Sequence, residues 1–155
     1  MLKKHWKGLL LSIGIALLAG VIGMFLGGNM DSYSSLNKPP LTPPKILFPI
    51  MWTILYILMG ISAYMVYQSD TRYKTKAIVV YIIQLIINSL WTLFFFRLNL
   101  KLFAFIWLVF LIIVLLNTIY RFYKICKTAA ILQIPYLLWL LFASYLNYAI
   151  YYLNH

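Results

Sequence analysis

The chain has 155 residues, of which 65% are hydrophobic and only 10% are charged, whereas a soluble domain is about half apolar and about a quarter charged. Its net charge of +11 comes from 13 basic residues that lie in short clusters between long apolar runs, a pattern typical of loops at a membrane surface. The composition therefore excludes an ordinary soluble domain and argues against nucleic acid as a partner.

Five apolar stretches are long enough to form membrane-spanning helices, which need about 20 residues each. None contains Asp, Glu, Lys or Arg, and together they use most of the chain. The sequence therefore predicts an all-α membrane protein, with a single five-helix transmembrane domain covering residues 1–155. An odd number of spans argues against the two equal inverted halves of many transporters. The predicted spans are Gly8–Leu26, Ile46–Tyr67, Ala77–Phe96, Leu102–Tyr120 and Ala129–Tyr152.

The first span follows the basic segment from Lys3 to Lys7, which resembles the start of a signal peptide. However, its apolar run exceeds the ~7–15 residues of a signal-peptide core, so we expect a retained helix. Small residues form two lines along it, which favour close helix packing in lipid. The lines are Gly8/Ser12/Ala16/Gly20 and Ala19/Gly23/Gly27.

The loop from Gly28 to Lys45 is the only long connection, and its second half is rich in proline. Prolines fix φ and hold this strand stiff and extended. Thr42 followed by Pro43 suits an N-cap and a first helical position, so helix two can begin there. The loop is interpreted either as a rigid connector or as a lid over a site.

Pro49 and Pro135 lie inside predicted spans. Because a proline has no N–H to donate to the carbonyl four residues earlier, each favours a kink.

The distribution of Lys and Arg predicts the orientation in the membrane. The N-terminal segment and the loops 68–76 and 121–128 carry nine of the 13 basic residues, and the other side carries four. In a bacterial cell membrane this bias places the N-terminus in the cytoplasm and the C-terminus outside.

With no charges inside the spans, a proton or ion pathway of buried acids is not expected. Aromatic and amide side chains instead recur at spacings of three or four residues, so each set can share one helix face and point into the bundle. These sets are Phe48, Trp52 and Tyr56; Gln84, Asn88, Trp91 and Phe95; Trp107 and Asn117; and Trp139, Ala143 and Asn147.

Trp52, Trp91 and Trp107 are all expected roughly 8 Å below the face that carries the proline-rich loop, and Trp139 nearer the middle. An interfacial aromatic belt is the alternative, although a belt predicts Trp at both faces and only Trp6 lies at the other. The amides have an alternative role in interhelical hydrogen bonds. That role is favoured for Gln133, Asn117 and Asn147, whereas for Asn88 binding and structure are balanced.

A cavity of Trp, Tyr, Phe and a few amides suits a flat aromatic ligand, because rings stack on rings and amides fix the orientation. The only cysteine is Cys126, and His5 and His155 lie at the chain ends. No metal-binding spacing exists, so neither a metal site nor a cofactor is expected, and a metal-free macrocycle fits better than haem.

Several segments, in this order and at these spacings, resemble the tryptophan-rich sensory protein or translocator protein family, also called the peripheral-type benzodiazepine receptor family (TspO/MBR). The resemblance covers nearly the whole chain. The segments that carry it are Lys38–Pro44, Phe48–Tyr56, Gln84–Trp91, Phe94–Phe96, Pro135–Trp139 and Ala143–Asn147.

The resemblance implies a five-helix bundle, often a homodimer, that binds protoporphyrin IX and synthetic isoquinoline carboxamides and benzodiazepines. It also implies light-dependent breakdown of protoporphyrin, with Trp52 and Trp139 in the photochemical role. Tyr33 and Pro43 would close the cavity from the loop. The residues expected to line it are Phe48, Trp52, Tyr56, Asn88, Trp91, Trp107, Trp139, Ala143 and Asn147.

Animal members of the family also bind cholesterol through a C-terminal segment that ends in Lys or Arg. The segment from Leu146 to His155 has neither, which argues against cholesterol as the ligand.

The leading hypothesis is a membrane protein that senses, sequesters or helps to degrade porphyrin. No Ser/His/Asp set, paired carboxylates or phosphate-binding glycine loop is present. A transporter of porphyrin or lipid is the alternative, and a ligand-dependent receptor or scaffold is a third.

Overall fold

A computed structural model of the chain describes residues 2–28 and 35–154. Five helical segments are long and apolar enough to cross a membrane, as predicted: α1, α2, α3 with η2, α4, and α5 with α6. η2 is a short π-helical continuation of α3. The elements are α1 (Leu2–Gly27), α2 (Leu47–Tyr67), α3 (Lys74–Thr92), η2 (Leu93–Arg97), α4 (Lys101–Ile125), α5 (Lys127–Leu132) and α6 (Ile134–Asn154).

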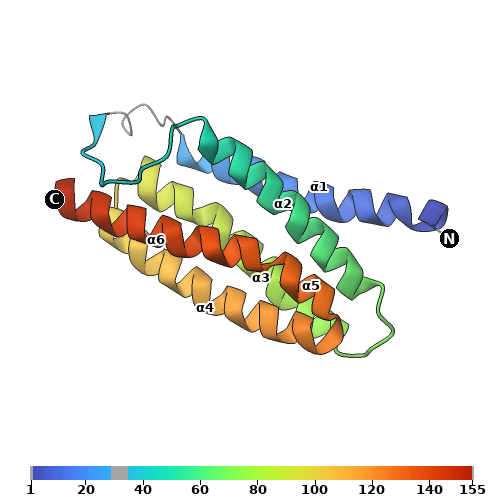
Figure 1. Ribbon diagram of the computed structural model, residues 1–155. Coiled ribbons are helices and arrows are strands. Elements are labelled where there is room, and N and C mark those ends of the chain that lie inside the picture. The colour runs from blue at the N-terminus through green and yellow to red at the C-terminus, as the bar shows by residue number, and fades with distance from the viewer. Residues whose placement is uncertain (1, 29–34, 155) are drawn as a thin grey trace.

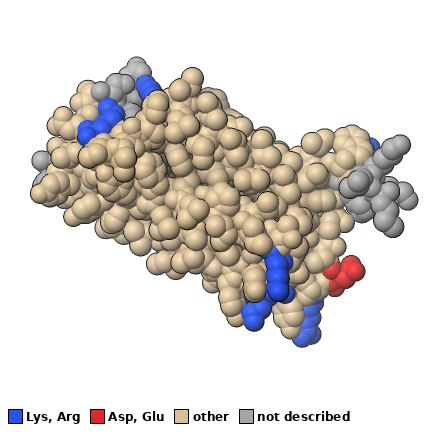
Figure 2. Space-filling model, viewed as in Figure 1, with Lys and Arg blue, Asp and Glu red and all other residues tan. Residues whose placement is uncertain are grey.

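The helices run up and down the bundle (Figure 1). The N-terminus lies at the same end as the α2–α3 and α4–α5 connections, which we call the basic end. The segment 35–46, the η2–α4 turn and the C-terminus lie at the other end, which we call the loop end. α1 packs on α2 and α3, while α4 packs on α3 and α6. The space-filling view shows basic side chains near both ends of this face, with a band free of charged side chains between them (Figure 2).

Most of the helices extend past their predicted bounds, and the longest extensions are in α1 and α4. α1 begins at Leu2 rather than Gly8, and α4 continues to Ile125 rather than Tyr120. The predicted bounds stop where the apolar run stops, whereas Lys and Arg are good helix formers that carry a helix beyond the membrane. Hydropathy therefore locates the spans but not the helix ends.

The small residues of α1 allow it to pack closely against α2 of the same chain. The Ser12 hydroxyl donates a hydrogen bond of 2.7 Å to the Gly60 carbonyl of α2. A Cβ atom added at Gly60 would lie 2.5 Å from the Ile13 Cα, so only glycine permits this approach. About two turns further along α1, a Cβ at Gly20 would lie 2.6 Å from the Tyr56 ring. The predicted lines of small residues therefore bring α1 close to its own neighbours.

α2 begins at Leu47, one residue after the predicted start of the span at Ile46, so the alternative start at Thr42 and Pro43 is wrong. Pro44 disfavours the helical region for the residue before it, so Pro43 cannot open a helix. The Thr42 hydroxyl instead donates to the Pro39 carbonyl at 2.7 Å, within a turn. The later start also leaves Pro49 in the first turn of α2. Since an N–H there has no partner inside the helix, Pro49 interrupts no hydrogen bond of α2.

The last span breaks at the expected proline. α5 ends at Leu132 and α6 begins at Ile134, because Pro135 has no N–H to donate to the carbonyl four residues earlier. The buried Gln133 lies at the break, and its amide nitrogen donates to the Ser62 hydroxyl of α2 at 3.1 Å. The Ser62 hydroxyl in turn donates to the Ala129 carbonyl at 2.6 Å. The interhelical role expected of Gln133 is therefore present.

Candidate functional site

Aromatic side chains fill the space between α2 and α6. α2 contacts α6 much less extensively than it contacts α1. The rings of Trp52 and Trp139 meet there edge to face, with centroids 6.4 Å apart and planes at 89°. Phe48 lies 5.9 Å from Trp139 in a similar arrangement. Two helices whose backbones scarcely touch are thus joined through large rings.

A chain of buried hydrogen bonds lies beneath these rings. The Tyr56 hydroxyl donates to the Asn88 side-chain oxygen at 2.7 Å, and the Asn88 amide nitrogen donates to the Tyr136 hydroxyl oxygen. The Tyr136 hydroxyl then donates to the Gln84 side-chain oxygen at 2.8 Å. Trp52 stacks on Tyr56 with centroids 5.6 Å apart. Unpaired polar groups are costly in the bilayer core, so this network fixes the surface on which Trp52 lies.

Asn147 has the interhelical role that its position favours. Its side-chain oxygen accepts a bond of 2.9 Å from the Trp91 indole N–H of α3. Its amide nitrogen donates at 2.9 Å to the Lys101 carbonyl at the start of α4. Asn147 is almost fully buried. It therefore orients Trp91 and does not present a free amide to a ligand.

Four of the residues expected at the site converge on one small internal void of about 10 Å³. This volume corresponds to about one water molecule. The void lies where α2, α3, α4 and α6 meet, so residues from distant parts of the sequence share it. It is lined by Trp52, Asn88, Trp91 and Ala143, together with Leu108, Leu111 and Leu140.

Trp139 contributes an unused hydrogen-bond donor. Only 9% of Trp139 is exposed. Its indole nitrogen is buried and has no hydrogen-bond partner among the described residues. Buried indole N–H groups are normally paired. A donor is therefore available at the aromatic contact between α2 and α6.

Trp107 lies apart from the other pocket tryptophans, contrary to expectation. Its indole N–H donates to the Ile87 carbonyl of α3 at 2.8 Å. Its ring belongs to a separate cluster, with Phe94 at 5.0 Å and Phe110 at 5.7 Å. Periodicity placed it on a helix face, but did not show which neighbouring helix that face meets.

Asn117 does not point into the bundle either. Its side chain is exposed and accepts a bond of 2.7 Å from the Arg121 Nε on the same helix. Among the described residues Asn117 makes no interhelical bond, because its side chain lies on the exposed face of α4.

The proline-rich segment is fastened to α6. Tyr145 donates from its hydroxyl to the Pro40 carbonyl at 2.9 Å, and the Asn154 amide nitrogen donates to the Asn37 carbonyl at 2.8 Å. Pro43 is half-buried in this segment, and Tyr33 lies outside the described residues. The sequence reasoning missed both anchors of α6, because nothing local indicates which loop they meet.

Tyr136 was also missed as a site residue, although a signal was present. It precedes Trp139 by three residues and therefore shares its helix face. Its ring lies 6.2 Å from that of Trp52.

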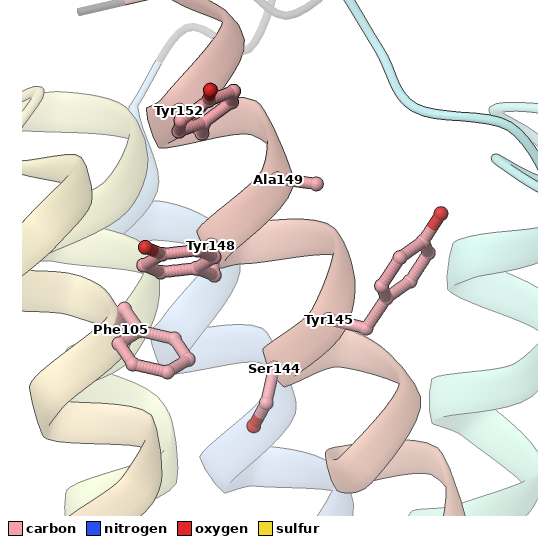
Figure 3. Close-up of a pocket in the computed structure, with 6 residues that line it drawn as sticks. All are labelled: Phe105, Ser144, Tyr145, Tyr148, Ala149 and Tyr152. Carbon is pink, nitrogen blue, oxygen red and sulfur yellow. The ribbon is translucent and has the colours of Figure 1, made fainter.

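A groove of about 410 Å³ opens on the outer surface of α4 and α6. In the close-up, Tyr148 of α6 lies against Phe105 of α4, while Tyr145 points away from them (Figure 3). The groove contains none of the residues expected at the site. Its lining residues are Phe105, Ser144, Tyr145, Tyr148, Ala149 and Tyr152.

Comparison with known proteins identifies the family of the chain. Residues 12–153 match the model of the TspO/MBR family. A tryptophan-rich protein TspO of Chlorobaculum tepidum is 37% identical over 99% of both chains. A protein of the same name from Archaeoglobus fulgidus is 37% identical over 94% of this chain and 96% of its own. The human translocator protein is 31% identical over 89% of this chain and 87% of its own. The chain is therefore a multi-pass integral membrane protein that belongs to the TspO/MBR family.

Proposed function

We propose that this protein binds a flat, hydrophobic, metal-free tetrapyrrole such as protoporphyrin IX among α2, α3 and α6, and that it senses, sequesters or promotes the light-dependent degradation of this ligand. The observation that carries the proposal is the contact of Trp52 with Trp139, centroids 6.4 Å apart, between helices that otherwise touch little. Aromatic faces and edges are the groups that bind a flat ring system.

The two sides of the site differ in how firmly they are held. On the α3 side, Asn88 and Trp91 are fixed by hydrogen bonds to neighbouring helices. On the α6 side, the Trp139 indole has no hydrogen-bond partner among the described residues. A void of about 10 Å³ is far smaller than a tetrapyrrole. Binding therefore requires α2 and α6 to separate, and the break at Pro135 provides a hinge for α6.

The separated helices would offer stacking surfaces from Trp52 and Trp139 and a donor from the Trp139 N–H. Under light, an excited porphyrin in contact with an indole can take an electron from it, and dioxygen is the oxidant for the subsequent breakdown. Such chemistry needs contact and exclusion of water rather than an acid–base pair. It is consistent with a site built from aromatic side chains.

The binding step is tested by titrating protoporphyrin IX into the purified protein in detergent and following tryptophan fluorescence. Trp139→Phe removes the free donor and part of the ring contact, so we expect affinity to fall about 5- to 20-fold. Trp107→Phe is the matched control, because Trp107 lies in the separate cluster with Phe94 and Phe110. The affinity of this variant for protoporphyrin IX should match that of the wild type. Equal affinities in both variants would contradict the proposed site.

Binding is distinguished from transport by uptake of protoporphyrin into sealed vesicles. Toward the basic end, the interior contains the buried ring pair of Tyr81 and Phe122 and the bond between Gln133 and Ser62. This packing supports a site open toward the loop end rather than a path through the bundle. We expect bound porphyrin without accumulation inside the vesicles.

We further propose that the N-terminus faces the cytoplasm of a bacterial cell, because the basic end carries most of the Lys and Arg. Cys126 is the only cysteine and lies partly exposed at the α4–α5 junction of that end. A membrane-impermeant maleimide should therefore label inverted vesicles and not intact cells stripped of their outer wall.

Two expectations from the family resemblance are also proposed here. One is a homodimer, which cross-linking in native membranes would detect. The other is competition for the porphyrin site by isoquinoline carboxamide and benzodiazepine-type drugs, which the same fluorescence titration would measure.

A further inference from the structure

Two of the cations at the loop end, Arg97 and Lys101, donate hydrogen bonds to backbone carbonyls. The Arg97 Nε donates to the Leu26 carbonyl at 2.7 Å, and its terminal nitrogen donates to the Phe25 carbonyl at 3.0 Å. The Lys101 Nζ donates to the Phe95 carbonyl at 2.7 Å. These charges therefore cap carbonyls at the ends of α1 and η2, where helix dipoles favour cations.

At the basic end, cations lie beside exposed aromatic rings. Two of them also bond to protein groups: the Lys74 Nζ donates to the Tyr67 carbonyl at 3.1 Å, and a terminal nitrogen of Arg72 donates to the Tyr73 hydroxyl at 3.0 Å. Five pairs of a cation and a ring occur among the described residues of this end, on α1, on and between α2 and α3, and around the α4–α5 junction. Each ring is about half exposed, so the pairs lie on the outer surface. Measured from the cation to the ring centroid, the pairs are Lys7–Trp6 at 5.7 Å, Lys74–Tyr67 at 5.1 Å, Arg72–Tyr73 at 5.1 Å, Lys124–Tyr120 at 5.2 Å and Lys127–Tyr123 at 5.7 Å. We call them the basic–aromatic collar.

The collar combines two features that position charge at the surface of a bilayer. Tyrosine and tryptophan rings favour the headgroup level of a membrane, and a cation held over such a ring is kept at the same depth. A cation–π contact leaves the N–H groups of the cation able to donate to further acceptors. The only acidic residue in the described part of this end is Asp70, so little negative charge from the protein competes. Figure 2 shows that one acidic side chain beside the basic ones.

We propose that the basic–aromatic collar is a binding surface for anionic phospholipid headgroups, which it selects over zwitterionic ones. Lysine and arginine donate charge-assisted hydrogen bonds to phosphate oxygens. Each basic side chain near an anionic bilayer surface adds to the attraction. The pairs come from the N-terminal part of α1 and from the α2–α3 and α4–α5 connections, so the surface serves several neighbouring lipids rather than one pocket. This surface is independent of the tetrapyrrole site.

The test is lipid selectivity in reconstituted bilayers. The full-length protein is placed in phosphatidylcholine bilayers with a trace of spin-labelled phosphatidylglycerol or spin-labelled phosphatidylcholine, and electron spin resonance measures the relative association of each with the protein. We expect phosphatidylglycerol to be preferred about threefold at low salt. Because charge is responsible, about 0.5 M NaCl should reduce the preference.

A pair of variants locates the effect. Lys124→Gln with Lys127→Gln removes two charges from the collar, and the preference for phosphatidylglycerol should fall by about half or more. Lys38→Gln with Lys45→Gln removes the same charge from the loop end and should leave the preference unchanged. Circular dichroism checks that both variants fold. Equal association of the two lipids with the wild type, or equal losses in the two double variants, would overturn the proposal.

Discussion

The side-chain oxygen of Asn147 in α6 accepts a hydrogen bond of 2.9 Å from the indole N–H of Trp91 in α3. The amide nitrogen of Asn147 donates at 2.9 Å to the Lys101 carbonyl of α4. One buried amide thus joins three helices near the loop end and orients a ring that lines the internal void. Its contribution to stability and its effect on the site can be measured together.

Replacing Asn147 by leucine should destabilise the fold. The substitution keeps the approximate volume but leaves the Trp91 N–H and the Lys101 carbonyl without their partner, so we expect a loss of about 1–2 kcal/mol. Denaturant unfolding in mixed micelles, followed by circular dichroism, provides the measurement. Asn117→Leu is the control, because Asn117 is exposed and bonds only within its own helix to Arg121. A loss of similar size in the control would show that amide loss is harmful at any position.

Tyr136→Phe tests the network beneath Trp52. The missing hydroxyl leaves the Asn88 amide nitrogen and the Gln84 oxygen unpaired in a fully buried position. We expect the free energy of unfolding to fall by about 1–3 kcal/mol. Tyr148→Phe removes a hydroxyl from the outer surface of the same helix, where Tyr148 is 48% exposed. This variant should change the free energy of unfolding by less than about 0.5 kcal/mol. Thermal unfolding of the two variants in one detergent gives the comparison, and similar shifts would contradict a structural role for the network.

Gly60→Ala should separate α1 from α2. The added Cβ would lie 2.5 Å from the Ile13 Cα, and the Ser12 hydrogen bond to the Gly60 carbonyl would be strained. Overpacking against backbone atoms costs about 1–3 kcal/mol. Gly14→Ala is the matched control within α1, because a Cβ there meets no atom within 4 Å. Alanine is the better helix former by about 1 kcal/mol, so this variant should be neutral or stabilised. Chemical unfolding of both variants measures the free energy of unfolding, which should fall for Gly60→Ala and stay equal or rise for Gly14→Ala.

Trp52→Phe and Trp139→Phe should each slow the loss of protoporphyrin under light while the fold is retained. Phenylalanine keeps a ring at the contact between α2 and α6 but is a much poorer electron donor than an indole. Illumination of the bound porphyrin with the spectrum followed over time gives the rate, and circular dichroism reports the fold. Each variant is compared at saturating porphyrin, so that weaker binding does not imitate slower chemistry. Unchanged rates in both variants would remove the tryptophan mechanism.

The sequence by itself predicted the five spans and their order, because burial in lipid imposes a length and a composition on each helix that any apolar run reveals. It also placed Trp52 and Asn88 on inward faces, since residues three or four apart share one side of a helix. The apolar run placed the start of α2 within one residue, at Ile46, whereas the N-cap signal of Thr42 was misleading, because Pro44 disfavours a helical conformation at Pro43.

Only the tertiary structure decided which of these faces meet. It placed Trp52 against Trp139 but directed the Trp107 indole to the Ile87 carbonyl. In the structure, the Asn117 oxygen accepts a hydrogen bond from Arg121 of the same helix rather than from another helix. Helical periodicity fixes a direction around one axis and contains no information about the neighbour in that direction. That neighbour is set by how closely the backbones approach, as where the bare Cα of Gly60 lets α1 lie against α2.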